Sequence, residues 1–383
     1  MFPDNCRKVD RCFALLMGMV FATASSTPIN AQPKTPTPSQ SPTTENPAAS
    51  RTRQPVQAFG GQLAVFLGHE GEVTSAVFSP DGRQILTTSE DNTARLWDRK
   101  GHLLAVLQGH EGEVTSAVFS SDGGPILTAS GDYTARLWDG KGNLLTVLRG
   151  HQDFDTRVVF GRQILAVFSP DGRQLLTVGE DKNARLWGSK GNLLAVLRGH
   201  EDRVNSAVFS PDGRQILTAS EDKTARLWDS KGNLLAELRG HEDRVNSAVF
   251  SPDGRQILTV SRRDSTARLW DSKGNLQAVL RWHEGWVNSA VFSPDGRHIL
   301  TASGDKTARL WDVSALSAAQ SEQIAALEAF REGVSRNNAQ LAKFQAHESS
   351  VNSAVFSPDG RRILTASGDK TARLWDTSGN LLA

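Results

Sequence analysis

The stretch that decides the fold runs from His200 to Asp229 and reads HEDRVNSAVFSPDGRQILTASEDKTARLWD. The same phrase occurs, with small changes, in seven copies. Successive copies begin 41, 41, 49, 41, 42 and 64 residues apart, which defines a period of 41 with insertions in three copies. A period of this length indicates a stacked repeat array and not a string of unrelated domains. The leading histidines are His69, His110, His151, His200, His241, His283 and His347.

The residue pattern within each copy predicts a small antiparallel sheet. Residues 204–209 form a first strand that leads into Ser-Pro-Asp-Gly, where proline at the second position and glycine at the fourth favour a type I turn. Three further strands follow at about residues 216–220, 224–228 and 234–238, separated by polar turn residues. A single four-stranded sheet cannot cover both of its faces. The copies are therefore expected to stack into a ring, which leaves only short edges.

Composition excludes several classes of partner. Lysine plus arginine number 43 and aspartate plus glutamate 42, so no bulk charge is available to hold nucleic acid or an anionic membrane. The only cysteines, Cys6 and Cys12, lie near the N-terminus, and no His/Cys cluster has the spacing of metal ligands. We expect no metal, no cofactor, no nucleic-acid partner and a monomeric chain.

The first 57 residues differ from the rest. Arg7, Lys8 and Arg11 precede an apolar run at 12–22 and small residues after it, which is typical of a signal peptide over 1–24. The run is too short to span a bilayer, so no transmembrane helix is expected after processing. Proline, serine and threonine dominate 25–57, which predicts a disordered linker. We expect an exported protein, in the periplasm, envelope or medium; the alternative is a cytoplasmic protein with an unstructured tail.

The repeat resembles a known family. A Gly-His opening, the Ser-Pro-Asp-Gly turn, an aspartate six residues before tryptophan, and a Trp-Asp ending are similar to the WD40 repeat, which builds β-propellers. The resemblance covers residues 58–383. It implies an all-β, seven-bladed β-propeller of four-stranded antiparallel blades. The near-identical copies resemble bacterial WD-repeat proteins in particular.

Histidine, aspartate and a hydroxyl in each copy also resemble a catalytic set. In the WD40 family, however, these residues and the tryptophan form a buried hydrogen-bond chain that holds each blade together, and an active site is not normally repeated seven times. We therefore expect a structural role. The clearest sets are His69, Thr87, Asp91 and Trp97; His110, Thr128, Asp132 and Trp138; and His200, Thr218, Asp222 and Trp228.

Two insertions and the termini depart from the pattern. Blade three carries extra residues before its first strand, and blade six carries an insertion at about 313–338. In that insertion Ile324, Leu327, Phe330 and Val334 recur at helical spacing, which predicts a short amphipathic helix that packs on the rim or docks a partner. At the ring closure, residues 61–67 and 378–383 both read as a fourth strand for blade seven. We expect residues 61–67 to pair there and the C-terminal residues to fray.

The family resemblance places partner binding on the narrow face of the propeller. The positions are the residues flanking the valine after the leading histidine and the residue before the turn aspartate. An exposed tryptophan near arginines is the usual composition of a binding hot spot, which favours Trp286. The expected partner-binding residues are Trp286, Asn288, Arg203, Asn205, Arg244, Asn246, Arg263, Glu72, Glu90, Glu113 and, in the enlarged loop of blade three, Phe154.

Three functions are compatible with this sequence. The first is a non-catalytic scaffold that binds a protein or peptide partner on the narrow face. The second is a propeller enzyme, a hydrolase or lyase, which would need polar residues outside the repeat gathered at the axis; the sequence offers none. The third is an inert, decaying repeat array. We favour the scaffold and expect no enzymatic activity.

Overall fold

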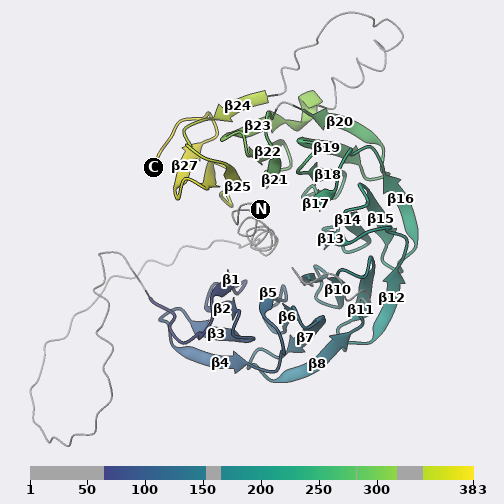
Figure 1. The fold of residues 1–383 in the computed structure, drawn as a ribbon, viewed down its shortest axis with the longest axis vertical. Coiled ribbons are helices and arrows are strands. Elements are labelled where there is room, and N and C mark those ends of the chain that lie inside the picture. Colours follow the sequence, from purple (N-terminus) through teal and green to yellow (C-terminus); the bar gives the residue numbers. More distant parts are fainter. Residues whose placement is uncertain (1–63, 152–164, 282, 317–339) are drawn as a thin grey trace, which may run out of the picture.

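The computed structural model describes residues 64–151, 165–281, 283–316 and 340–383. These residues form seven antiparallel sheets, or blades, that follow one another around an arc in chain order (Figure 1). Six blades have four strands, and the seventh has three. The prediction of an all-β, seven-bladed propeller is confirmed. The signal peptide, the linker, Phe154 and the predicted helix around Ile324 lie outside the described residues and stay predictions.

Within a blade the strands are named a to d, from the centre of the arc outward (Figure 1). The a strands are β1 (Val73–Phe78), β5 (Val114–Phe119), β9 (Leu165–Phe168), β13 (Val204–Phe209), β17 (Val245–Phe250), β21 (Val287–Phe292) and β25 (Val351–Phe356). The b strands are β2 (Gln84–Ser89), β6 (Ile126–Ser130), β10 (Gln174–Val178), β14 (Gln215–Ser220), β18 (Gln256–Ser261), β22 (His298–Ser303) and β26 (Arg362–Ser367).

The outer two strands follow the same order. The c strands are β3 (Ala94–Asp98), β7 (Thr134–Trp138), β11 (Ala184–Gly188), β15 (Ala225–Asp229), β19 (Thr266–Asp271), β23 (Ala308–Asp312) and β27 (Ala372–Asp376). The d strands are β4 (Leu103–Leu107), β8 (Leu144–Arg149), β12 (Leu193–Leu197), β16 (Leu234–Leu238), β20 (Leu276–Leu280) and β24 (Gln340–Phe344).

The Ser-Pro-Asp-Gly turn between strands a and b is closed by its own side chains. In blade 4 the Gly213 N–H donates to the Ser210 carbonyl at 2.8 Å, and Gly213 has a positive φ of 70°. The Ser210 hydroxyl and the Arg214 N–H both donate to Asp212 Oδ1, at 2.6 and 3.0 Å. Asp212 thus acts as a turn former, as the sequence suggested.

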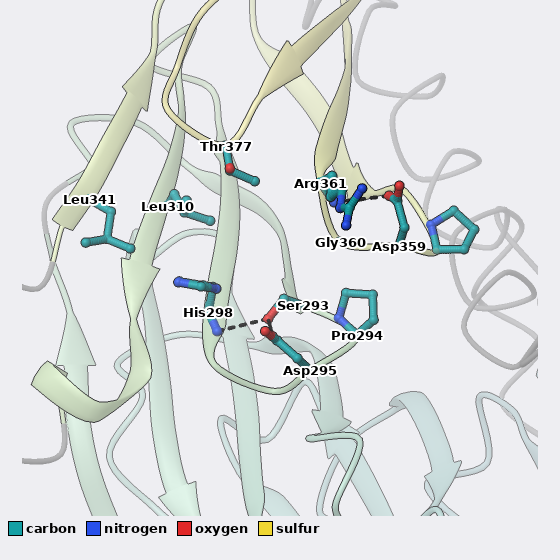
Figure 2. Close-up of a pocket in the computed structure, with 11 residues that line it drawn as sticks. Ser293, Pro294, Asp295, His298, Leu310, Leu341, Asp359, Gly360, Arg361 and Thr377 are labelled. Carbon is teal, nitrogen blue, oxygen red and sulfur yellow. Dashed lines mark hydrogen bonds between the residues drawn. The ribbon is translucent and has the colours of Figure 1, made fainter.

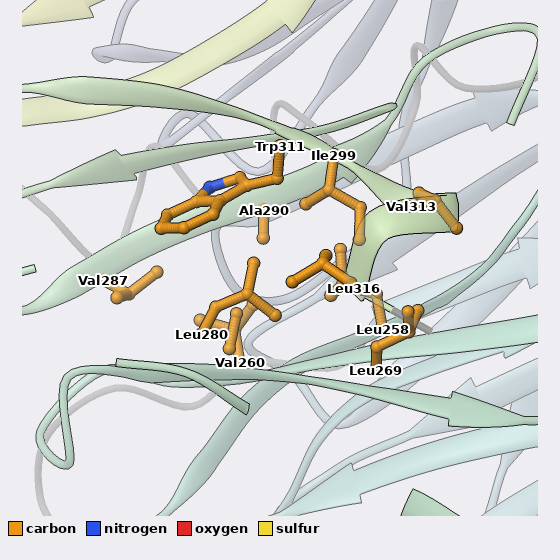
Figure 3. Close-up of a cluster of buried hydrophobic side chains, with 11 residues drawn as sticks. Leu258, Val260, Leu269, Leu280, Val287, Ala290, Ile299, Trp311, Val313 and Leu316 are labelled. Carbon is orange, nitrogen blue, oxygen red and sulfur yellow. The ribbon is translucent and has the colours of Figure 1, made fainter. Parts of the chain in front are cut away.

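Apolar side chains join each blade to the next. Strands b, c and d of one blade present leucines and alanines, and strands a, b and c of the next present valine, alanine, isoleucine and tryptophan. Figure 3 shows this packing between blades 5 and 6, where Leu258, Leu269 and Leu280 meet Val287 and Trp311. Since a lone blade leaves both of its faces exposed, this repeated contact stabilises the array.

The insertion of blade 6 lies between β23 and β24, as expected. Its first residues, 313–316, are helical. Val313 and Leu316 are buried in the cluster shared by blades 5 and 6 (Figure 3). The described start of the insertion therefore packs against the blades.

Blades 7 and 1 leave exposed the apolar surfaces that pairs of neighbouring blades bury elsewhere in the array. Val73 of blade 1 is 49 % exposed, whereas its equivalent in blade 2, Val114, is fully buried. Leu364 of blade 7 is 44 % exposed, whereas its equivalent in blade 6, Leu300, is fully buried. The boundary between blades 7 and 1 is therefore open, as Figure 1 shows at the left of the ring.

The expected closure of blade 7 is wrong. Residues 64–67 are not in a strand, and β27 does not pair with them. The C-terminal residues instead lie along β27: Leu381 forms a bridge with Trp375, and Leu374 exchanges backbone hydrogen bonds with Ala383. The prediction that these residues fray is wrong as well, because they follow β27 directly and reach its edge through the tight turn at Gly379.

Candidate functional site

The buried chain of polar residues is present in every blade. In blade 4 the Trp228 indole N–H donates to Thr218 Oγ1 at 2.9 Å, and Thr218 Oγ1 lies 2.8 Å from His200 Nε2. His200 Nδ1 lies 2.7 Å from Asp222 Oδ2. Because an indole can only donate and a carboxylate only accept, a neutral histidine with its proton on Nδ1 satisfies the whole chain.

The other blades repeat this geometry, with distances of 2.7 to 3.0 Å. Their members are His69, Thr87, Asp91 and Trp97; His110, Thr128, Asp132 and Trp138; His151, Thr177, Asp181 and Trp187; His241, Thr259, Asp264 and Trp270; His283, Thr301, Asp305 and Trp311; and His347, Thr365, Asp369 and Trp375.

The electrostatics of these chains agree with a structural role. Burial lowers the pKa of His241, which keeps the imidazole neutral. Burial opposes ionisation of Asp132, but hydrogen bonds from His110 and Thr134 outweigh it and hold the pKa of Asp132 well below its usual range. The Thr218 side chain is fully buried. A hydroxyl in this position has no access to a substrate, so the chains hold the blades together.

The positions predicted to bind a partner lie at the edge of each blade where strand b turns into strand c. In blade 4 the Glu221 N–H donates to the Arg203 carbonyl at 2.9 Å, which places both side chains on this edge. The Ser-Pro-Asp-Gly turns lie at the other end of strand b. The edge that carries Arg203 and Glu221 is called the binding face below, because the sequence prediction places partner binding there, and the edge with the Ser-Pro-Asp-Gly turns is called the opposite face.

Two arginines of the binding face pair with glutamates of the preceding blade. Arg203 lies 3.7 Å from Glu180 of blade 3, and Arg244 lies 2.8 Å from Glu221 of blade 4. Burial raises the pKa of Glu221, and the Arg244 and Arg203 guanidiniums act against that effect. The expected basic side is therefore partly neutralised by Glu180 and Glu221.

At the boundary of blades 5 and 6 an aromatic contact takes the place of the ion pair. The Arg262 guanidinium carbon lies 4.9 Å from the centroid of the Trp286 ring. Arg262 stands where blades 3 and 4 have glutamate, because blade 5 has one extra residue in this turn. Trp286 remains 47 % exposed. Sequence reasoning singled out Arg263, which is exposed, but missed Arg262; the extra residue was the available signal.

The prediction for Asn288 is wrong, because this side chain is 1 % exposed and joins two blades. Its Nδ2 donates to the Val351 carbonyl at 2.9 Å and to Ser350 Oγ at 3.0 Å. Asn205 donates in the same way to the Val245 carbonyl at 3.2 Å. In blade 1 Thr74 replaces asparagine and donates to the Val114 carbonyl at 2.6 Å. The position after the valine therefore links blades.

The remaining predicted residues are dispersed. Asn246 Oδ1 accepts the Arg262 N–H at 2.9 Å, and so supports the turn beside Trp286. Glu72 and Glu90 are exposed and Glu113 is half-buried, all in blades 1 and 2. The structure thus brings together Trp286, Arg262 and Asn246 at one boundary, and Arg203, Glu221 and Arg244 at another.

A cavity of about 400 Å³ lies on the opposite face between blades 6 and 7 (Figure 2). Within the two turns that form it, the backbone N–H of His298 donates to Ser293 Oγ at 2.9 Å, and the backbone N–H of Arg361 donates to Asp359 Oδ1 at 3.1 Å. In the described ranges no three histidine, cysteine, aspartate or glutamate side chains gather as a metal site. No helix of the described residues is long and apolar enough to cross a membrane.

The repeated blade, its inter-blade packing and its internal hydrogen-bond chain define the class: a β-propeller built from seven copies of one unit. The sequence model of the family described as "WD domain, G-beta repeat" matches residues 60–98, 101–139, 142–188, 191–229, 232–271, 274–312 and 338–376, and the chain belongs to this family. The resemblance seen in the sequence is confirmed.

A curated relative is WD repeat-containing protein 38 of Mus musculus, which is 38% identical over 53 residues. These residues are 14% of this chain and 18% of the relative, so the chain spans less than a fifth of that relative's length. Repeats of the family generally mediate protein–protein interactions, and its members are typically non-enzymatic scaffolds.

Proposed function

We propose that this chain is a non-catalytic scaffold that binds a protein or peptide partner on its binding face, with Trp286 at the centre of the contact. The observation that carries the proposal is the exposure of Trp286 beside Arg262. The tryptophans of the seven hydrogen-bond chains are at most 5 % exposed. An exposed indole stacked on a guanidinium is the kind of anchor that supplies most of the free energy at a protein interface.

The surroundings of Trp286 support its role as an anchor. Arg262 and Asn246 hold the turn next to the ring, so the ring is positioned before a partner arrives and loses little conformational freedom on binding. The exposed Arg263 next to it supplies a charge for the rim of the contact. The histidine, aspartate and threonine side chains of the hydrogen-bond chains bond to one another within the blades. We therefore assign no catalytic activity to them.

The test is affinity capture from native extracts with the full chain and two variants. Trp286→Ala removes the proposed anchor. His298→Gln is the matched control, because it lies on the opposite face and glutamine stands at the equivalent position of several blades, such as Gln256. We expect proteins captured by the native chain and by His298→Gln to be lost with Trp286→Ala. Equal capture by all three baits would place the binding site elsewhere.

A further inference from the structure

Two departures from the repeat meet at the boundary of blades 5 and 6. In the turn between strands b and c, blade 4 has Glu221 directly before the turn aspartate. Blade 5 has one residue more in this turn and carries Arg262 and Arg263 there instead. Blade 6 has Trp286 where blades 1, 2, 4 and 5 have a charged residue. The extra arginines and the exposed tryptophan thus come from different blades and form one surface on the binding face.

The two arginines have different surroundings. Arg262 is half-buried, and its guanidinium lies over the Trp286 ring, so it positions that ring. Arg263 is exposed and has no ion-pair partner among the residues that the structure describes. Burial raises the pKa of Glu221 in blade 4, and the charge of Arg263 is one of those that oppose this rise. Arg263 therefore lies within electrostatic range of blade 4, and its guanidinium is available to an anion.

Blade 6 lacks two carboxylates that would compete for such an anion. Where blade 4 has Asp202 and Glu221, blade 6 has Gly285 and Gly304. The Gly304 N–H donates to the Trp286 carbonyl at 2.8 Å, as its equivalent in blade 4 does to the residue that corresponds to Trp286. Position 304 is therefore beside the tryptophan, and a glutamate there would place a negative charge next to the ring.

The missing side chain also leaves space beside Trp286. A Cβ atom on Gly304 would lie 3.5 Å from the Trp286 backbone nitrogen and 3.9 Å from Ser350 Oγ, which are ordinary contact distances. A side chain would fit at this position, so its absence leaves room for a residue of a partner. Glu284 is exposed in the same loop, but glutamate follows the leading histidine in six of the seven blades and does not distinguish this boundary.

We propose that the partner contributes an acidic peptide segment, in which an aspartate or glutamate binds Arg263 and a neighbouring apolar residue lies on Trp286. This inference rests on the proposed function and names the class of partner. A guanidinium can donate two parallel hydrogen bonds to a carboxylate, and an indole offers a large apolar surface. A basic segment would instead place its cations against two arginines, without the carboxylates that blade 4 provides.

The experiment selects binders of the full chain from a phage-displayed library of short random peptides. We expect the enriched peptides to share an acidic residue close to an aromatic or aliphatic residue. One enriched peptide, made synthetically with a fluorescent label, is then titrated by fluorescence anisotropy against the native chain and its variants. Trp286→Ala and Arg263→Glu should each weaken its binding by about tenfold or more.

A second pair of variants tests the missing carboxylate. Gly304→Glu restores beside Trp286 the residue that blade 4 has as Glu221. Gly131→Glu makes the same substitution at the equivalent turn of blade 2 and is the matched control. We expect about tenfold weaker binding with Gly304→Glu and unchanged binding with Gly131→Glu. A peptide whose acidic residues are replaced by lysine should bind Arg263→Glu more tightly than it binds the native chain.

Failure of this inference can be distinguished from failure of the proposed function. Peptides that bind the native and Trp286→Ala chains equally would overturn both. Enriched peptides that need Trp286 but are basic or neutral, or that bind Arg263→Glu as tightly as the native chain, would overturn the acidic class and leave the proposed function intact. A selection that yields no binder would overturn the peptide segment as the partner class, and affinity capture would then decide the proposed function by itself.

Discussion

Thr218 accepts the indole N–H of Trp228 at 2.9 Å and at the same time lies 2.8 Å from His200 Nε2, so one buried hydroxyl joins strands b and c to the loop that begins the blade. Thr218→Val keeps the shape of the side chain but leaves a buried donor and a buried acceptor without partners. We expect the free energy of unfolding to fall by about 2 kcal/mol, measured by urea denaturation.

Thr218→Ser is the control for this change, because it keeps the hydroxyl and loses one methyl group. We expect it to be the milder of the two variants. Equal urea midpoints for the Thr218→Val and Thr218→Ser chains would show that the hydroxyl contributes nothing to stability.

Stability should also depend on pH. Burial lowers the pKa of His151, His241 and His283 in the folded chain, whereas an unfolded histidine titrates near about 6.5. The unfolded chain then binds more protons below pH 6.5, so stability falls as the pH falls from about 6.5. The lowered pKa of the turn aspartates, such as Asp132, adds a second loss below about pH 4.

Denaturation curves between pH 8 and pH 3 check this expectation. His241→Gln should lower stability at pH 8 and weaken its dependence on pH between 6.5 and 5. Constant stability of the native chain between pH 7 and pH 5 would contradict the assignment of neutral histidines.

Substitutions of Asn288 and Trp286 should have opposite effects: the first should lower stability and the second should lower binding. Asn288→Val removes the hydrogen bond to the Val351 carbonyl and should lower the free energy of unfolding by about 1 to 2 kcal/mol, with partner capture unchanged at a temperature where the chain is folded. Asn288→Thr should be milder, because Thr74 makes the equivalent bond in blade 1. Trp286→Ala should do the reverse, with binding lost and the unfolding midpoint preserved. If the folded Asn288→Val chain no longer captured the partner, Asn288 would take part in binding, contrary to our assignment.

The turn between strands b and c carries backbone strain that can be relieved. Lys306 has a positive φ of 70°, and Asn92 occupies the same position in blade 1 with a φ of 64°. Asparagine tolerates this conformation better than lysine does. We expect Lys306→Asn to raise the free energy of unfolding by about 0.5 kcal/mol and Asn92→Lys to lower it by a similar amount. If both substitutions changed the free energy of unfolding in the same direction, side-chain contacts and not the positive φ would determine the stability of this turn.

Much of this architecture could be predicted from the sequence, because each repeat contains the residues that determine its own turns and strands. The Ser-Pro-Asp-Gly turn fixes the first hairpin, and Asp212 satisfies that turn locally. The spacing of His200, Thr218, Asp222 and Trp228 identified the hydrogen-bond chain by family resemblance, and the structure contains it in all seven blades.

The binding face was harder to predict. Sequence position placed Trp286 and Asn288 on either side of Val287, yet Asn288 is buried and Trp286 is exposed. Asn288 lies in β21 and is covered by residues 350 and 351 of blade 7, whereas Trp286 precedes the strand. The contact between Arg262 and Trp286 joins residues of different blades, so no pattern within one repeat could reveal it.

The sequence by itself determined the period, the strands, their turns and the polar chain within each blade, since all of these depend on contacts inside one repeat of about 41 residues. Only the tertiary structure decided what happens between repeats: which arginine meets which glutamate, which asparagine is buried, and which end of the chain pairs with β27. Residues 64–67 and 381–383 carry equivalent strand sequences, so pattern alone cannot rank them. The structure gives the edge of β27 to the C-terminal residues, because they follow β27 directly and reach its edge through a tight turn.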